Sequence, residues 1–217
     1  MTAPILFAAV ALSAIPALAE EGGWRPLFDG KTLEGWTSPG GGKPGDGWEV
    51  VDGVLHRAGR GGDLISAAEF GDFELEFEWK VAAKANSGVK YRVRKSPQGW
   101  LGPEYQVLDD AGHPNGKVPK TSAAALYDVL PPAADKALRP VGEWNRSKVV
   151  AVGDRIEHWL NGKRVVAVRV GSAEWEAARK AGKFAKLAGF AAPGPGRILL
   201  QDHGDEVWFR SIRVRPR

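Results

Sequence analysis

Residues 73–80 decide the fold class, because their side chains alternate without exception in the order Phe73-Glu74-Leu75-Glu76-Phe77-Glu78-Trp79-Lys80. Successive residues of a β-strand point to opposite faces of a sheet, so this pattern predicts a strand with one apolar and one charged face. Three shorter segments alternate in the same way, at residues 89–93, 104–107 and 198–203. We therefore expect several antiparallel strands, each of which buries one face in a core.

The second half of the chain predicts a strand meander and one helix. Segments 147–152, 155–160 and 163–170 are expected to pair as neighbours, and Asn161-Gly162 between the last two is a strong hairpin signal. A short helix is expected after Ser172, which suits an N-cap. The basic segment Arg210–Arg217 is interpreted as an edge strand whose charge opposes pairing with other sheets.

The frequency of turn residues supports an all-β fold. The chain has 28 glycines and 15 prolines, and it shows neither an internal repeat nor a linker that would divide it. About a dozen short strands with one short helix predict a jelly-roll β-sandwich of two antiparallel sheets.

Composition limits the classes of function. Of the 217 residues, 43% are hydrophobic and 26% are charged, which is usual for a globular protein. The net charge of +4 is modest and the basic residues are scattered among acids, so we expect no nucleic-acid partner. Cysteine is absent, which excludes disulfides and thiolate metal sites. The nine tryptophans suit a core, and their flat rings also suit sugars.

The N-terminus has the features of an export signal. Residues 2–19 carry no charge, include an apolar run over 5–15, and end in Ala17-Leu18-Ala19, which fits a cleavage site. We interpret residues 1–19 as a signal peptide and residues 20–217 as one domain, which is periplasmic or secreted. The apolar run is short for a bilayer, and no later segment qualifies, so no stable membrane span is expected after signal removal.

The polar residues of the alternating segments are candidates for a ligand-binding face. They are Glu78, Lys90, Arg92, Glu104, Gln106, Gln201 and His203. Arginine, glutamine and histidine beside Trp100, Tyr127 and Trp159 are typical of a face that binds hydroxyl groups and stacks on a sugar ring. The alternative, an ordinary solvated sheet face, explains the same alternation.

Standard catalytic motifs do not settle the chemistry. The chain has no G-x-S-x-G elbow, no H-E-x-x-H pair and no P-loop. The loop over residues 109–115 contains Asp109, Asp110 and His113, and its oxygen ligands suit calcium, although turn formation explains them equally well. For His158, in a predicted hairpin strand, we favour a structural role.

A series of short motifs covers nearly the whole chain after residue 20. They are Leu27-Phe28-Asp29-Gly30-Lys31, Leu33-Glu34-Gly35-Trp36, Asn86-Ser87-Gly88-Val89-Lys90-Tyr91-Arg92, Gly102-Pro103-Glu104-Tyr105-Gln106-Val107-Leu108-Asp109, Leu126-Tyr127-Asp128, Gly142-Glu143-Trp144-Asn145, His158-Trp159-Leu160-Asn161-Gly162, Leu200-Gln201-Asp202-His203-Gly204 and Phe209-Arg210-Ser211-Ile212. In this order they resemble the 3-keto-disaccharide hydrolase family. The resemblance implies a concanavalin A-like jelly roll, export, and cleavage of sugars already oxidised to a ketone at C3. One departure is Lys90, where the family more usually has an apolar or aromatic residue.

The implied substrate suggests a reaction. A ketone at C3 acidifies the hydrogen on C2, and its removal gives an enolate that expels the substituent at C1; water can then add. We predict His203 as the base, because imidazole exchanges protons near neutral pH. Arg92, together with Lys90, would stabilise the enolate oxygen. Glu104 would be the acid or would orient His203.

The remaining candidates are expected to bind substrate. Gln106 and Gln201 would bind hydroxyl groups, Tyr127 or Trp159 would stack on a ring, and Glu78 completes the predicted set. No cofactor is assigned, but a divalent metal held by Glu104 and His203 is an alternative electrophile to Arg92.

Two other classes of function compete with this one. A non-catalytic carbohydrate-binding module of the same fold would use the same face without an acid–base pair. A laminarinase-like hydrolase is disfavoured, because Gln106 stands where the Glu-x-Asp-x-x-Glu strand of such enzymes needs Asp.

Overall fold

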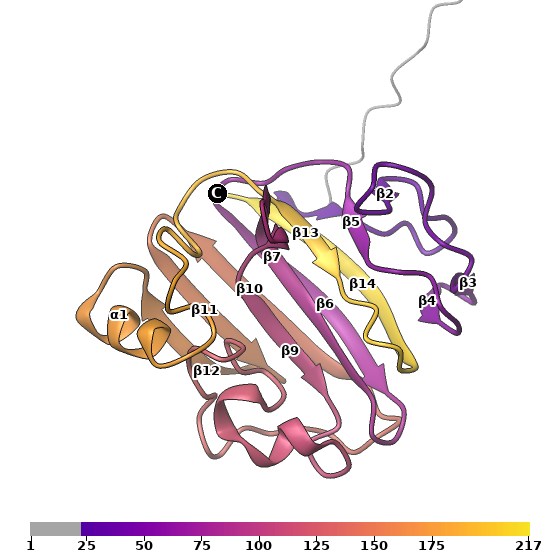
Figure 1. Ribbon diagram of the computed structural model, residues 1–217. Helices are drawn as coiled ribbons and strands as arrows, with labels where there is room; N and C mark the ends of the chain where they lie inside the picture. Colours follow the sequence, from indigo (N-terminus) through magenta and orange to yellow (C-terminus); the bar gives the residue numbers. More distant parts are fainter. Residues whose placement is uncertain (1–22) are drawn as a thin grey trace, which may run out of the picture.

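The structure, a computed structural model, describes residues 23–217 and consists of two antiparallel sheets packed face to face (Figure 1). This architecture confirms the predicted jelly-roll sandwich with one short helix. The predicted signal peptide lies outside the described residues. Within residues 23–217, no helix has the length and apolar character needed to cross a membrane.

The larger sheet has the strand order β12-β11-β10-β6-β14-β4-β3, and β1 pairs with β14. Its strands are β1 (Arg25–Pro26), β3 (Trp48–Val51), β4 (Val54–Arg57), β6 (Phe73–Val81), β10 (Asn145–Val152), β11 (Arg155–Leu160), β12 (Lys163–Arg169) and β14 (Val207–Pro216). The predicted meander is therefore confirmed as β10, β11 and β12.

The smaller sheet has the strand order β2-β5-β13-β7-β8, and β9 also pairs with β7. Its strands are β2 (Trp36–Thr37), β5 (Leu64–Ser66), β7 (Asn86–Ser96), β8 (Gly99–Leu101), β9 (Glu104–Leu108) and β13 (Arg197–Leu200). Because β13 ends at Leu200, Gln201 and His203 lie in the following loop and not in a strand as predicted.

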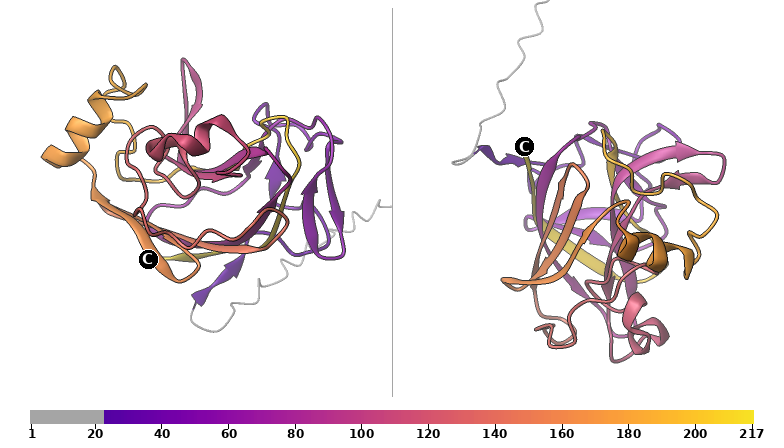
Figure 2. Two further views of the ribbon diagram at one scale, coloured as in Figure 1. Left: turned by 90° about the horizontal axis from the view of Figure 1, so that it is seen from below. Right: turned by 90° about the vertical axis from the view of Figure 1, so that its left-hand side faces the viewer.

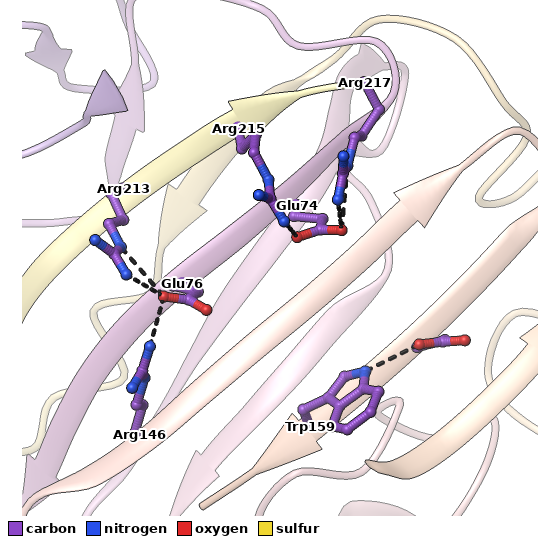
Figure 3. A network of polar contacts seen from close by, with 8 residues as sticks. Glu74, Glu76, Arg146, Trp159, Arg213, Arg215 and Arg217 are labelled. Atoms are coloured by element: carbon purple, nitrogen blue, oxygen red, sulfur yellow. Dashed lines mark hydrogen bonds and ion pairs between the residues drawn. The ribbon is translucent and has the colours of Figure 1, made fainter. Parts of the chain in front are cut away.

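Strand β6 lies near the centre of the larger sheet and confirms the alternation read from the sequence. The rings of Phe73, Phe77 and Trp79 are buried in the core between the sheets. On the outer face, Glu76 accepts hydrogen bonds from Arg146 and Arg213 (Figure 3). Partial burial alone would raise the pKa of Glu76, but these two guanidinium groups outweigh it and lower the pKa.

The interpretation of the basic C-terminal segment as an edge strand is wrong. Strand β14 lies between β6 and β4, and its arginines face the glutamates of β6 (Figure 3). Arg215 and Arg217 both donate to Glu74. The alternating basic residues therefore neutralise the acidic face of the neighbouring strand, and strand order, which the local pattern does not encode, decides this role.

Two buried tyrosines of the smaller sheet bind polar groups of the larger one. The Tyr105 hydroxyl accepts a hydrogen bond from Ser147 Oγ (2.7 Å), which in turn accepts one from the Trp79 indole (2.8 Å). The Tyr91 hydroxyl lies 2.8 Å from His158 Nε2. Since buried polar groups are costly unless they are paired, these bonds favour one alignment of the two sheets.

His158 is fully buried and neutral in this network. Its Nδ1 lies 3.0 Å from the Ala124 carbonyl oxygen, which can only accept, so Nδ1 carries the proton and Nε2 accepts from Tyr91. Burial lowers the pKa of His158 to about 4, although backbone contacts from Ala124 and Ala125 partly oppose this. The predicted structural role of this histidine agrees with its placement.

The helix α1 (Ala173–Lys180) begins where the sequence predicted. Ser172 Oγ accepts a hydrogen bond from Trp175 N (3.2 Å), as an N-cap does. Figure 2 shows α1 on the same side of the sandwich as the 3₁₀ turns at Pro114–Lys117 and Pro119–Thr121, the side of the smaller sheet.

The burial of neutral His158 predicts a loss of stability in mild acid. In the unfolded chain this histidine takes up a proton below its ordinary pKa of 6.5, whereas in the folded state it does so only near 4. The contribution of His158 to the free energy of unfolding is therefore full above pH 6.5 and falls as the pH drops toward 4. Denaturant unfolding should show a loss of about 2 kcal/mol between about pH 7 and about pH 5.

The control for this prediction is His158→Gln, which removes the titrating group. The variant will be less stable at all pH values, but its free energy of unfolding should depend less on pH over the same range. Equal pH dependence of the two proteins would contradict the assignment to His158.

Candidate active site

Residues of β7 and β9 alternate between the core and the outer face of the smaller sheet. Val89 and Tyr105 are register partners and both lie in the core. Their neighbours Lys90 and Glu104 are also partners and therefore share the outer face. The alternation in the sequence correctly predicted this pair.

Glu104 is a buried carboxylate on that outer face. It is only 6% exposed, and its side chain lies over Gly88, where a Cβ atom would come within 2.4 Å of Glu104 Oε1. Lys90 Nζ lies 3.9 Å from Glu104 Oε2. Burial raises the pKa of Glu104, and the positive charges of Lys90 and Lys183 only partly oppose that rise. The carboxyl group is therefore poised to hold a proton.

A chain of polar contacts connects Gln106 to His203 on the same face. Gln106 Nε2 donates to Asn86 Oδ1 (2.9 Å), and the Asn86 backbone N–H donates to Asp205 Oδ2 (2.9 Å). That oxygen lies 3.9 Å from His203 Nδ1. His203 is thus placed beside the Asn86 end of β7.

The loop that carries Gln201 and His203 is held by Asp202. Its carboxylate pairs with Arg57 Nε (2.7 Å), and both side chains are nearly inaccessible to solvent. The same carboxylate accepts hydrogen bonds from the backbone N–H groups of Gly61 and Gly62. Asp202 is therefore a structural residue. Gln201 N–H donates to the Gly88 carbonyl oxygen and so continues the pairing with β7, which directs the Gln201 side chain to the outer face. His203 lies near Asp205 on the same side.

Tyr127 borders Glu104 on the side away from Lys90. The Tyr127 backbone N–H donates to the Glu104 carbonyl oxygen (3.0 Å). Burial raises the pKa of the Tyr127 phenol, and the nearby carboxylates of Glu104 and Asp128 raise it further. The phenol therefore remains a neutral ring with a hydrogen-bonding hydroxyl.

Six of the nine predicted site residues lie on one face of the smaller sheet, and we call them the polar cluster: Lys90, Glu104, Gln106, Tyr127, Gln201 and His203. Asn86 and Gly88 are two residues apart on β7. His203 lies near Asn86, through Asp205, and the Glu104 side chain lies over Gly88. These two backbone positions are about 7 Å apart along the strand.

Arg92 does not belong to the polar cluster, and its predicted placement is wrong. The register of β7 and β13 shifts between Arg197 and Leu199, and Arg92 has a φ of 48°. Such a bulge adds one residue, so the side chains beyond it change faces. The fully buried Arg92 side chain thus reaches the larger sheet, where it donates to the Gly153 carbonyl oxygen (2.8 Å) and pairs with Asp72 (3.3 Å).

Glu78 and Trp159 are also separate from the polar cluster, because they lie on the outer face of the larger sheet. Arg210 Nε donates to Glu78 (2.6 Å). The indole of Trp159 (Figure 3) donates to Glu157 (2.9 Å). Lys148 Nζ lies 4.4 Å from the centroid of the same ring. Both belong to strands whose outer residues alternate as the sequence predicts, but the sequence does not show which sheet each strand joins.

A cavity on that opposite face is a weaker candidate for catalysis. It has a volume of about 320 Å³ and is lined in part by Glu76, Glu78 and Arg146. Its two acids are already paired with arginines. We therefore place the candidate active site at the polar cluster, which contains the buried acid and the histidine.

The loop over residues 109–115 uses its oxygen atoms for turns. Asp109 accepts hydrogen bonds from Lys84 N (2.7 Å) and Ala111 N (3.0 Å). Asp110 Oδ1 accepts one from Ala123 N (2.7 Å). In the described part of the chain, His, Asp and Glu side chains do not gather in threes as a metal site would need. These contacts favour the turn interpretation of the loop.

Lys183 is the main residue of this face that the sequence analysis missed. Its Nζ lies 4.0 Å from the centroid of the Tyr127 ring. It sits after α1, in a segment with no strand alternation, so no periodic signal points to the sheet. His113, whose ring centroid is 6.3 Å from that of His203, also reaches this face from a loop.

The fold and the polar cluster together define a jelly-roll protein with a candidate active site on the outer face of its smaller sheet. The model of the 3-keto-alpha-glucoside-1,2-lyase-like domain matches residues 23–215. A 3-keto-disaccharide hydrolase of Bacteroides thetaiotaomicron is 34% identical, over 89% of this chain and 78% of that protein. The chain belongs to the family of 3-keto-alpha-glucoside-1,2-lyase-like domains, which confirms the resemblance found in its motifs.

Solved structures agree with this assignment. A crystal structure described as a glycosyl hydrolase of Parabacteroides distasonis has 32% identity and a TM-score of 0.82, and the match covers 90% of this chain and 94% of that one. A second glycosyl hydrolase structure from the same organism has 28% identity and a TM-score of 0.68, over 89% and 99% of the two chains.

The raised pKa of Glu104 predicts that ionisation of this carboxyl lowers the free energy of unfolding. In the unfolded chain the carboxyl loses its proton near its ordinary pKa of 4.5, while the folded state resists ionisation above that value. Glu104→Gln should therefore raise the melting temperature at neutral pH, and this gain should disappear below about pH 4. Thermal unfolding at several pH values tests this.

The matched control for that measurement is Glu174→Gln, which neutralises an exposed acid on α1. Its melting temperature should change little at any pH. A lower melting temperature for Glu104→Gln at neutral pH would show that ionised Glu104 stabilises the fold, against the prediction.

Proposed function

We propose that this chain is an exported enzyme that cleaves the glycosidic bond of 3-keto-glycosides or 3-keto-disaccharides at the polar cluster. The observation that carries the proposal is the buried carboxyl of Glu104 beside Lys90, on the same face as His203. Family membership and the name of the Bacteroides relative support the substrate class. Cleavage proceeds by removal of the C2 proton and elimination of the C1 substituent, with net hydrolysis when water adds.

Two groups of the polar cluster handle protons. His203 removes the proton from C2, because a neutral imidazole is a competent base near neutral pH. Glu104 gives a proton to the departing glycosidic oxygen, since its raised pKa keeps a protonated fraction available.

Positive charge for the enolate comes from Lys90. The sequence predicts Arg92 for this role, but its side chain is turned between the sheets. Lys90 projects from the same strand toward Glu104 and so faces the reacting carbons. A fixed cation beside the C3 oxygen stabilises the charge that develops there in the transition state.

The other cluster residues bind the sugar. Gln106 and Gln201 offer amide groups to hydroxyls, and the Tyr127 ring provides a surface for stacking. Gln106 Oε1 is buried without a hydrogen-bond partner among the described residues.

The proposal of export rests on residues 2–19. Their uncharged apolar run and small residues before Glu20 are the pattern of a cleaved signal. A periplasmic or secreted enzyme would meet oligosaccharides and glycosides outside the cytoplasm.

The substrate proposal is tested by incubating purified protein with 3-keto-trehalose or a 3-keto-glucoside beside the unoxidised sugar. We expect release of the aglycone from the keto form alone, because only the ketone acidifies the C2 hydrogen. Product analysis by mass spectrometry distinguishes the elimination product from its hydrated form. Equal cleavage of both sugars would rule out the enolate route.

The assignment of His203 as base predicts a turnover defect. His203→Ala should lower kcat by about 100-fold or more and leave substrate affinity nearly unchanged, since proton transfer by a positioned side chain is worth about that much. His56→Ala serves as the control, because His56 stacks on Trp208 of the larger sheet, away from the polar cluster. If the wild type binds the sugar without turning it over, and His203→Ala binds it less tightly, the protein is instead a binding module.

A further inference from the structure

We propose that Lys183 is a second catalytic cation of this site, whose ammonium group contacts the C3 oxygen of the substrate from the side opposite Lys90. The inference rests on the proposed function and extends it to a residue outside the polar cluster. In this proposal, α1 and the loop that follows it position Lys183 at the site.

The place of the Lys183 ammonium carries the proposal. Its Nζ lies 4.0 Å from the Tyr127 ring centroid, and Tyr127 borders Glu104 on the side away from Lys90. Glu104 and Lys90 both act electrostatically on this ammonium. Two lysines from different elements thus lie near the buried acid, Lys90 on β7 and Lys183 in the segment after α1.

The Lys183 ammonium lies against two aromatic rings. The residue is exposed overall, but its ammonium lies against Tyr127 and near Phe184. This local burial lowers the pKa of Lys183, while Glu104 and Asp128 favour the charged form and Lys90 disfavours it. A partly desolvated cation interacts more strongly with a developing negative charge than one in water.

The backbone of Lys183 is clamped to the residue that follows Tyr127. Lys183 N–H donates to Asp128 Oδ2 (2.6 Å), while Asp128 Oδ1 pairs with Lys120 (2.6 Å). Gly182 lies so close to Asp128 that a Cβ atom there would come within 2.3 Å of its carbonyl oxygen. The loop and the Tyr127 segment therefore hold each other in one arrangement.

The helix holds the loop from the other side. The buried guanidinium of Arg179 donates through Nη1 to the carbonyl oxygens of Phe184 (2.8 Å) and Ala185 (2.9 Å). The rings of Phe184 and Phe190 stack with centroids 3.9 Å apart, and Trp175 of α1 stacks on Phe190 at 6.2 Å. Lys183 thus projects from a rigid support, as precise catalytic placement requires.

The role of Lys183 leaves the reaction balanced. The C2–H bond breaks, its proton goes to His203, and the electron pair moves to the C3 oxygen as an enolate. Lys183 and Lys90 remain protonated and hold that oxygen. When the C3 carbonyl forms again, the C1–O bond breaks and the leaving oxygen takes the proton of Glu104.

The test compares steady-state kinetics of the full chain and its Lys183→Met variant on a 3-keto-glucoside. We expect kcat to fall by about 100-fold with a much smaller change in KM, because the lost contact matters most in the transition state. Lys183→Arg should recover part of kcat. Lys186→Met is the matched control, an exposed lysine of the same loop, and should retain wild-type turnover.

A pH profile separates the catalytic role from a structural one. Activity should fall at alkaline pH as Lys183 loses its proton, and this limb should lie below the ordinary lysine pKa of 10.5. Asp128→Asn removes a charge that favours the ammonium, so it should move the limb to lower pH. A merely structural clamp would change the amount of folded protein without moving the limb.

Each outcome decides one question. Wild-type turnover with an unchanged kcat in Lys183→Met would overturn the role of Lys183 and leave the proposed function standing. A raised KM with unchanged kcat would make Lys183 a substrate-binding residue and also overturn the proposal. Absence of turnover in the wild type would overturn both.

Discussion

The hydrogen bonds that join the two sheets through Tyr91 and Tyr105 are the constraint on which the site depends. Each tyrosine is held in the core by a partner from the larger sheet, His158 for Tyr91 and Ser147 for Tyr105. Each is also the immediate neighbour of a site residue on the opposite face, Lys90 or Glu104. Because adjacent strand residues face opposite ways, fixing the tyrosines inside fixes the lysine and the acid outside. Burial raises the pKa of both phenols, so both hydroxyl groups stay neutral.

The ionised carboxylate of Glu104 at the candidate site lowers the stability of the fold. A carboxyl that is 6% exposed and lies over Gly88 pays a desolvation cost when it ionises, and the two lysines offset only part of it. Acidic residues elsewhere show the opposite balance: arginines outweigh the burial of Glu74 and Glu76 on the larger sheet and lower their pKa values. The contrast between the two faces separates a surface that supports the fold from one that is suited to chemistry.

A single inserted residue in β7 changes the chemistry available on the outer face. Without the bulge at Arg92, strict alternation would place its guanidinium beside Lys90, as the sequence predicted. With the bulge, Arg92 supports the turn at Gly153, while Val93 joins a small apolar group with Ile65 and Leu199 on the outer face. In the proposed mechanism the positive charge therefore comes from two lysines, Lys90 on β7 and Lys183 in the loop after α1.

The sequence by itself determined the fold class and the helix at Ser172, and its alternation placed Lys90 and Glu104 on one face. It singled out Gln201, His203 and Tyr127 through family motifs, although Gln201 and His203 lie in a loop and not in the predicted strand. Tertiary structure alone decided the inward turn of Arg92, the sheet to which Glu78 and Trp159 belong, the central position of β14, and the approach of Lys183. A bulge, a strand order and a packed loop depend on contacts between residues far apart in the chain, and local periodicity carries no record of them.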